Sequence, residues 1–357
     1  MTELFAPVQI GAITLPNRMV MAPLTRSRAD RDGIPSELHA QYYSQRATAG
    51  LIVSEGTFTA GSNRAFPGQP GLENSEQQAG WARVMDAVHA QGGHIFVQLM
   101  HAGRLTHAEL ADGHHPEAPS AIASGTAVRD WNERKECPTP RALEASELPR
   151  IVEQFRTAAR RAIDAGADGV EIHGANGYLL NEFLSDGANQ RMDNYGGSPR
   201  NRYRLIEEVL RAVVHEIGAE RVGIRFSPGL PTQGITETEV LETYGGLLDA
   251  VADLSLAYVS FICAAPAGLT LSDLAVRARA NGVTKVLSNV WSPEGTDRAL
   301  AEQQLAQPYV DAVVVGRALI ANPDLVRRWA EDLPLNEPDP ATFYAGGARG
   351  YTDYPTL

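Results

Sequence analysis

Short apolar runs recur along the whole chain, and each is followed by a segment in which apolar residues return every three to four positions. The runs are nearly continuously apolar, as expected for parallel strands that are buried on both faces. The segments between them have the period of amphipathic helices. The eight runs cover residues 18–23, 51–56, 94–100, 169–174, 221–227, 257–263, 285–289 and 312–317.

Eight strand–helix units in succession predict an α/β fold, a single (β/α)8 TIM barrel. The clearest helices are expected at residues 75–92 and 145–166, the first of them capped by Ser75. No shift in composition suggests a second domain, so residues 1–357 are expected to form one domain. Residues 101–146 fit an elaborated excursion after the third strand, on the face where barrel enzymes keep their active sites.

Polar residues gather where the predicted strands end. Because the C-terminal ends of barrel strands meet in one place, such residues converge on a single pocket, which is typical of a catalytic site. The residues are Thr25 and Arg26 after the first strand, Glu55 and Gly56 at the second, Gln98 and His101 at the third, His173, Asn176 and Tyr178 at the fourth, Arg225 at the fifth, and Gly316 and Arg317 at the eighth.

Several of these residues allow more than one interpretation. Gln98, within an apolar strand, fits a hydrogen bond in the core as well as a ligand contact. A buried Arg225 stays charged and needs a partner, which Glu55, Glu171 or a ligand oxygen could supply. The segment HGANGYLLNEFL (173–184) is either the capped end of a strand or a set of donors aimed at one ligand.

Gly316 and Arg317 follow the last predicted strand, where barrels of this class bind phosphate. Backbone amides at a glycine can approach an oxyanion without a side chain in the way. The sequence therefore predicts a phosphate-binding position at these two residues.

Composition narrows the choice of partner. The formal net charge of −12 argues against nucleic acid and against an anionic membrane, and no apolar run is long enough to cross a bilayer. No secretory signal is visible, and the well-separated Cys137 and Cys263 fit a reducing compartment. A cytoplasmic protein with a small-molecule partner is expected.

Several well-known sites are not indicated. His114 and His115 lack further ligands at the spacing of zinc sites, so no metal is expected. No G-x-G-x-x-G follows a strand, and neither a P-loop nor a G-x-S-x-G elbow occurs. A Rossmann dinucleotide site and an α/β-hydrolase are therefore disfavoured.

Seven motifs, in order from the N-terminus to the last residues, resemble the old yellow enzyme family of FMN-dependent ene-reductases. The family is built on a (β/α)8 barrel. The resemblance implies reduction of activated C=C bonds, as in enones and nitroalkenes, with NADPH or NADH entering the same pocket in a ping-pong cycle. It is compatible with a monomer or a homodimer. The motifs are APLTRSR (22–28), YYSQRA (42–47), FVQLMHAGR (96–104), EIHGANGYLLNEFL (171–184), RMDNYGGSPRNR (191–202), VGRALIANPDL (315–325) and GYTDYP (350–355).

The resemblance implies that FMN lies in the barrel mouth. Pro23 and Thr25 would then lie under and beside the isoalloxazine, and Gly56 would approach its N5 edge. Gln98 and Arg225 would face the pyrimidine part, where a fixed cation stabilises the reduced flavin.

The resemblance also implies roles at the substrate. His173 and Asn176 would donate hydrogen bonds to the carbonyl or nitro oxygen, on which negative charge grows as hydride arrives from flavin N5. Tyr178, protonated at neutral pH, would deliver the proton.

The chain departs from the family pattern at several positions. Asn289 and Val290 stand where a glycine pair usually binds the FMN phosphate, which suggests a lowered flavin affinity. Near the substrate, Met100 replaces a common tryptophan, and Phe66 a tyrosine. Gly56 replaces a usual alanine. With Tyr351, Met100 and Phe66 would line a widened substrate pocket.

Two rival hypotheses remain open at this point. One is a barrel that lost tight FMN binding and uses His173 and Tyr178 for flavin-free acid–base chemistry, such as isomerisation or dehydration. The other is a flavin-storage protein without turnover. The intact set of His173, Asn176 and Tyr178 argues against storage, because holding flavin needs none of them.

Overall fold

The core of the molecule is a closed barrel of eight parallel strands. The computed structural model describes residues 3–263, 271–290, 292 and 295–357. Neighbouring strands pair in chain order; β15 pairs with β3 and so closes the barrel. The strands are β3 (Met19–Met21), β4 (Leu51–Val53), β6 (Ile95–Met100), β11 (Gly169–Gly174), β12 (Val222–Phe226), β13 (Tyr258–Cys263), β14 (Lys285–Val290) and β15 (Ala312–Val315). The predicted fold class is confirmed; a single domain over residues 1–357 stays a prediction.

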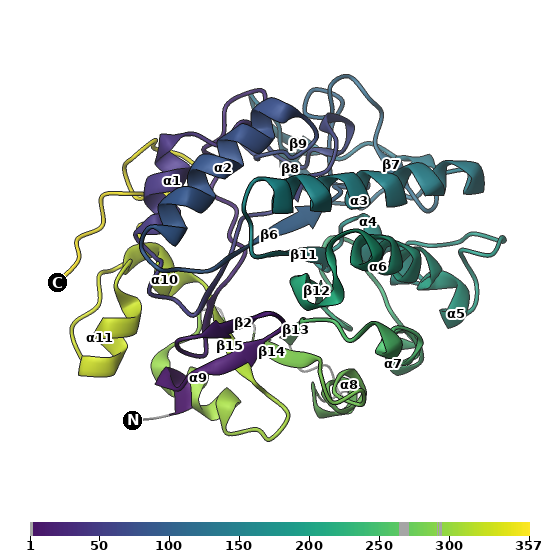
Figure 1. Cartoon of the computed structure of the whole chain (residues 1–357). Helices are drawn as coiled ribbons and strands as arrows, with labels where there is room; N and C mark the ends of the chain where they lie inside the picture. Colours follow the sequence, from purple (N-terminus) through teal and green to yellow (C-terminus); the bar gives the residue numbers. More distant parts are fainter. Residues whose placement is uncertain (1–2, 264–270, 291, 293–294) are drawn as a thin grey trace.

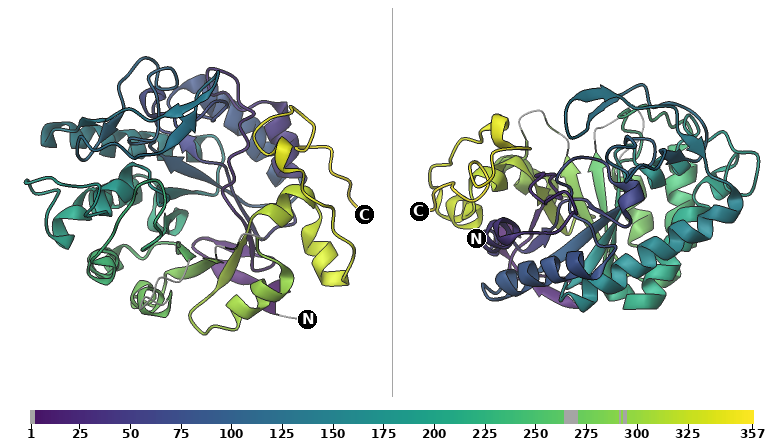
Figure 2. Two further views of the ribbon diagram at one scale, coloured as in Figure 1. Left: turned by 180° about the vertical axis from the view of Figure 1, so that it is seen from behind. Right: turned by 90° about the horizontal axis from the view of Figure 1, so that it is seen from above.

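Helices surround the strands, as the view along the barrel shows (Figures 1 and 2). In α3, Ile151, Phe155 and Ala158 recur at helical spacing and are buried in the core around the barrel. Among the described helices, none is both long and apolar enough to cross a membrane. They are α1 (Glu37–Ser44), α2 (Ser75–His89), α3 (Leu148–Asp164), α4 (Leu179–Leu184), α5 (Pro199–Arg202), α6 (Arg204–Ile217), α7 (Val240–Ala250), α8 (Leu271–Ala278), α9 (Arg298–Leu305), α10 (Arg317–Ala321) and α11 (Leu325–Glu331).

The predicted cap of the helix at residues 75–92 is off by one residue. The cap of α2 is Asn74, whose side chain accepts a hydrogen bond of 2.9 Å from the backbone N–H of Gln77. Ser75 is the first helical residue instead. Both residue types are good caps, so composition alone did not separate them.

A short antiparallel hairpin, β1 (Val8–Ile10) and β2 (Ile13–Leu15), closes the N-terminal end of the barrel. Ile10 and Leu15 pack in one buried cluster with barrel residues that include Leu51, Phe96 and Leu287. This apolar floor leaves the opposite, C-terminal end of the barrel for the polar residues.

The predicted excursion over residues 101–146 forms two small sheets. Outside the excursion, the short strand β5 (Thr57–Phe58) pairs with β6. Strands β8 (Ala127–Arg129) and β9 (Arg134–Glu136) make an antiparallel hairpin, while β7 (Glu117–Ala118) and β10 (Arg141–Ala142) run parallel. The excursion starts at the C-terminal end of β6, which is where the prediction placed it.

Candidate active site

A tight turn after β11 brings His173 and Tyr178 together. Asn176 (φ 59°) and Gly177 (φ 83°) adopt the left-handed conformation that asparagine and glycine tolerate best. The backbone N–H of Asn176 donates to Ser227 Oγ over 2.9 Å, which fixes the turn. Tyr178 then caps α4, with its ring centroid 5.3 Å from that of His173.

His173 is buried and electrically neutral. Burial, and then the charge of Arg225, lower the pKa of its imidazole to about 3. The Gln98 side-chain amide donates to His173 Nδ1 over 3.4 Å, so the imidazole proton is on Nε2. The imidazole is therefore a hydrogen-bond donor through Nε2 and carries no positive charge of its own.

Gln98 belongs to a buried network inside the barrel. Its Nε2 donates to Glu171 Oε1 over 2.7 Å, and the hydroxyl of Tyr258 donates to Glu171 Oε2 over 3.0 Å. Burial raises the pKa of Glu171, although Arg225, Gln98 and Tyr258 oppose the shift. Both interpretations of Gln98 stay compatible with the structure, because its Oε1 faces Gly56 at the mouth.

Arg225 places a fixed positive charge in the barrel mouth. Its side chain is buried, with Nη1 donating to Ser260 Oγ over 3.0 Å and Nη2 to Asn289 Oδ1 over 2.7 Å. Among the described residues, Nε finds no hydrogen-bond acceptor. Burial lowers the pKa of Arg225, yet a guanidinium keeps its proton at neutral pH. Both hydrogen-bond acceptors are neutral, and the nearest carboxyl group, that of Glu171, interacts with the guanidinium through space without a hydrogen bond.

Tyr178 is a protonated phenol beside an apolar wall. Burial, followed by Tyr344 and Cys137, raises its pKa to about 12. Tyr178 and Phe66 both pack against a buried cluster that includes Met100. Two of the three residues predicted to line the substrate therefore lie beside the predicted proton donor.

Gly56 and Met100 are complementary in shape. A methyl group added at Gly56 would overlap with Met100 Sδ. The absence of a side chain at position 56 thus makes room for the thioether of Met100.

The rim of the mouth is partly open to solvent in the described residues. Pro23 and Thr25 at the end of β3, Asn289 and Val290 at the end of β14, and Gly316 after β15 are all partly exposed. Arg317 is exposed and begins α10. This open rim, together with the buried cation of Arg225 and its unpartnered Nε, fits a flat, electron-accepting cofactor that carries a phosphate. These residues fit FMN.

Tyr351 is not brought to this group of residues. Its ring is fully buried, stacks on Tyr42 at a centroid distance of 4.1 Å and lies under the guanidinium of Arg28 at 4.8 Å. The tyrosine of this segment that interacts electrostatically with the site is Tyr344, which is 65% exposed and helps to raise the pKa of Tyr178. An exposed aromatic residue in the glycine-containing stretch FYAGG was the sequence signal for it.

The C-terminal segment is tied to the loop after β3 by two buried arginines. Arg26 Nη2 donates to the carbonyl of Gly350 over 2.8 Å. Arg28 donates to the carbonyls of Thr342 and Phe343 over 2.7 and 2.8 Å. Arg26, which was expected at the pocket, thus holds Tyr344 and its neighbours in place instead.

Glu182 was missed by the sequence analysis. It is fully buried in α4, and its Oε1 accepts a hydrogen bond of 2.8 Å from the backbone N–H of Arg104. Its Oε2 has no partner within the part of the chain that the structure describes. Burial raises the pKa of Glu182 to about 8, partly offset by Arg104. The carboxyl group joins the loop after β6 to the helix that follows Tyr178.

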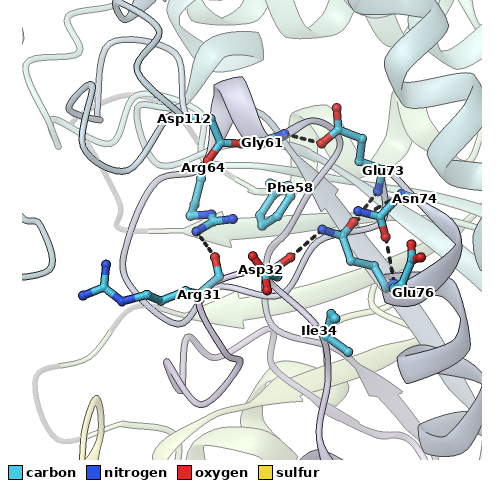
Figure 3. A pocket seen from close by; sticks show the side chains of 11 residues that line it. Arg31, Asp32, Ile34, Phe58, Gly61, Arg64, Glu73, Asn74, Glu76 and Asp112 are labelled. Carbon is cyan, nitrogen blue, oxygen red and sulfur yellow. Dashed lines mark hydrogen bonds between the residues drawn. The ribbon is translucent and has the colours of Figure 1, made fainter.

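A separate cavity of about 300 Å³ lies outside the barrel mouth (Figure 3). Asp32, Glu73, Asp112 and Arg64 are among its lining residues, and Arg64 donates to the carbonyl of Arg31 over 2.7 Å. None of the predicted site residues lines it.

Over the described ranges, no group of three His, Cys, Asp or Glu residues could hold a metal ion.

Comparison with known proteins gives the family. The profile of the NADH:flavin oxidoreductase / NADH oxidase family matches residues 3–336. The chain belongs to the old yellow enzyme family. As a member of this family it is an FMN-dependent oxidoreductase that reduces activated C=C bonds and takes its electrons from a nicotinamide nucleotide.

The relatives are similar over their full length. A probable flavin mononucleotide-dependent alkene reductase of Leishmania infantum is 40% identical, over 98% of this chain and 96% of that protein. The old yellow enzyme homologue from Zymomonas mobilis superposes with a TM-score of 0.93 at 37% identity, over 99% of this chain and 100% of that one. Morphinone reductase in complex with tetrahydroNAD superposes with a TM-score of 0.92 at 43% identity, over 100% and 98%.

Proposed function

We propose that this old yellow enzyme reduces enones, nitroalkenes and similar electron-poor alkenes in its barrel mouth, by a ping-pong cycle with NADPH or NADH. The observation that carries the proposal is the arrangement around His173. A neutral imidazole with its proton on Nε2 lies 5.3 Å from the ring of a protonated Tyr178, near the fixed charge of Arg225. Alkene reduction needs such donors and one proton source.

Three groups of residues, on the rim and inside the barrel mouth, would hold FMN. Pro23, Thr25 and Gly56 would flank the isoalloxazine, and Gln98 and Arg225 would face its pyrimidine edge. When bound, FMN accepts two electrons from the nicotinamide and passes them to the alkene. The phosphate would lie against Gly316, Arg317, Asn289 and Val290.

His173 and Asn176 would hold the substrate oxygen. Each can donate a hydrogen bond: the turn after β11 fixes the backbone of Asn176, and the contact with Gln98 orients the ring of His173 before substrate arrives. Donors fixed in advance stabilise the charge that develops on this oxygen more in the transition state than in the ground state. Tyr178 would then give its phenolic proton to the α-carbon.

The side wall of the pocket would set the size of the substrate. Phe66 and Met100 pack beside Tyr178, and Tyr344 lies at the exposed side. The unbranched thioether of Met100 adapts to irregular shapes, which suits a bulky alkene. We propose Tyr344 in place of Tyr351 as the aromatic residue that contacts the substrate. Cytoplasmic location and a monomeric or homodimeric state stay predictions.

The absorption spectrum of the purified full chain supplied with FMN tests the proposal. We expect a yellow protein that NADPH or NADH bleaches under anaerobic conditions and that an enone restores. The coenzyme that bleaches faster at equal concentration is the preferred donor. A colourless protein that does not take up FMN would overturn the proposal in favour of flavin-free acid–base chemistry. A yellow protein inert to both coenzymes would favour flavin storage.

A further inference from the structure

Asn289 connects three strands at the barrel mouth. It lies near the end of β14, in register with Ile262 of β13. Its Oδ1 accepts the 2.7 Å hydrogen bond from Arg225 of β12, and its Nδ2 donates to the carbonyl of Val314 in β15 over 3.2 Å. The amide is therefore held at both ends, so its oxygen has a fixed position relative to Arg225.

This contact fixes the plane of the Arg225 guanidinium. Ser260 Oγ accepts from Nη1 and Asn289 Oδ1 accepts from Nη2, which uses one donor on each terminal nitrogen. A planar fork held at two points cannot rotate without breaking one of these bonds. The Nε–H is left without an acceptor among the described residues, although it is buried.

The chemical nature of the group that accepts the hydrogen bond from Arg225 Nη2 matters as much as its position. An amide oxygen accepts the hydrogen bond without cancelling the positive charge, whereas a carboxylate would form an ion pair and neutralise it. A glycine at position 289, as is usual in the family pattern, would leave Nη2 without this acceptor. The side chain at 289 therefore acts on the arginine rather than on the phosphate alone.

We propose that Asn289 is a positioning residue that holds Arg225 toward the pyrimidine edge of the flavin and accepts its hydrogen bond without adding a negative charge beside it. The inference rests on the proposed function, because it assumes that FMN occupies the mouth. It adds a role that this chain's departure from the glycine pair makes possible. Asn289 would thereby tune the relative affinity for oxidised and reduced flavin.

Two substitutions at Asn289 separate its effect on the position of Arg225 from its effect on the local charge. Asn289→Asp keeps an acceptor but adds a negative charge beside Arg225, so reduced FMN, which is anionic, should lose about tenfold more affinity than oxidised FMN. For a two-electron couple this ratio equals a midpoint potential about 30 mV lower. Asn289→Ala removes the acceptor without adding charge, so oxidised FMN should lose about tenfold in affinity, and the midpoint potential should fall less than in Asn289→Asp.

The measurements need no turnover. The affinity for oxidised FMN comes from flavin fluorescence on titration into the full chain freed of flavin, and the midpoint potential from reductive titration of the FMN-loaded chain. Gln303→Glu adds the same charge on the exposed face of α9 and should change neither quantity. Circular dichroism checks that each variant is folded.

The outcomes are distinct. A wild-type chain that does not bind FMN overturns the proposed function, and this inference with it. Normal binding by the wild type, with an unchanged or raised potential in Asn289→Asp, overturns this inference alone. If the Asp variant does not fold, Asn289→Ala decides, because unchanged affinity for FMN would show that Asn289 does not position Arg225.

Discussion

Replacing Glu182 with glutamine should change how the stability of the protein depends on pH. The fold raises the pKa of this buried carboxyl from 4.5 to about 8, chiefly by desolvation. Because the folded state prefers the protonated form, the stability contribution is fully present below pH 4.5 and is lost as the pH rises toward 8. At 1.36 kcal/mol per pKa unit, the wild type should lose roughly 2 to 3 kcal/mol of unfolding free energy between pH 5 and 7 from this group.

Glutamine cannot ionise, and its Oε1 can still accept the hydrogen bond from the Arg104 backbone N–H. Glu182→Gln and wild type should therefore differ little at pH 5, and the variant should be the more stable by pH 7. Urea denaturation followed by tryptophan fluorescence at each pH measures the difference. Glu242→Gln removes the same charge from an exposed position and serves as the control. Parallel pH profiles for wild type and Glu182→Gln would refute the argument from burial.

Three further changes test the site. Tyr178→Phe should slow alkene reduction by about 10²- to 10⁴-fold, the usual contribution of a general acid, and should leave flavin reduction nearly unchanged. Anaerobic stopped-flow measurements separate the two steps, and equal slowing of both would contradict the role of Tyr178 as proton donor. Gly56→Ala should push the Met100 side chain out of its present space, so KM should rise for bulky enones more than for small ones, and adding Met100→Ala should reverse the effect. Tyr351→Ala should lower the free energy of unfolding by about 3 to 5 kcal/mol without a selective change in KM, whereas a selective rise in KM at unchanged stability would place this ring at the substrate.

The barrel could be predicted because its strands leave a strong trace in the sequence. Strands buried on both faces read as continuous apolar runs, and the run at 169–174 coincides with β11. The ends were less certain: the run at 18–23 forms a strand only over Met19–Met21, since the following residues turn outward to the rim. The hairpin of β1 and β2 was missed, because its strands have three residues each.

The partners of the site residues depend on register, which a single sequence does not reveal. Arg225 was expected to need a mate, and the candidates were carboxylates or a ligand. Its acceptors are Ser260 and Asn289, which lie 35 and 64 residues away in the chain and become neighbours only when the barrel pairs its strands. Tyr351 was placed at the substrate from its motif, but the local chain direction buries it against Tyr42.

The hydrogen bond between Arg26 and Gly350 can form only after the C-terminal segment has been synthesised. The two residues are 324 positions apart, and β3 cannot complete its pairing until β15 has been made. At the usual rate of protein synthesis, 5–20 residues per second, roughly 16 to 65 s pass between the synthesis of Arg26 and that of Gly350, whose carbonyl it binds. During that interval a growing chain carries an open sheet with two unpaired edges, so the catalytic mouth is among the last parts of the molecule to form.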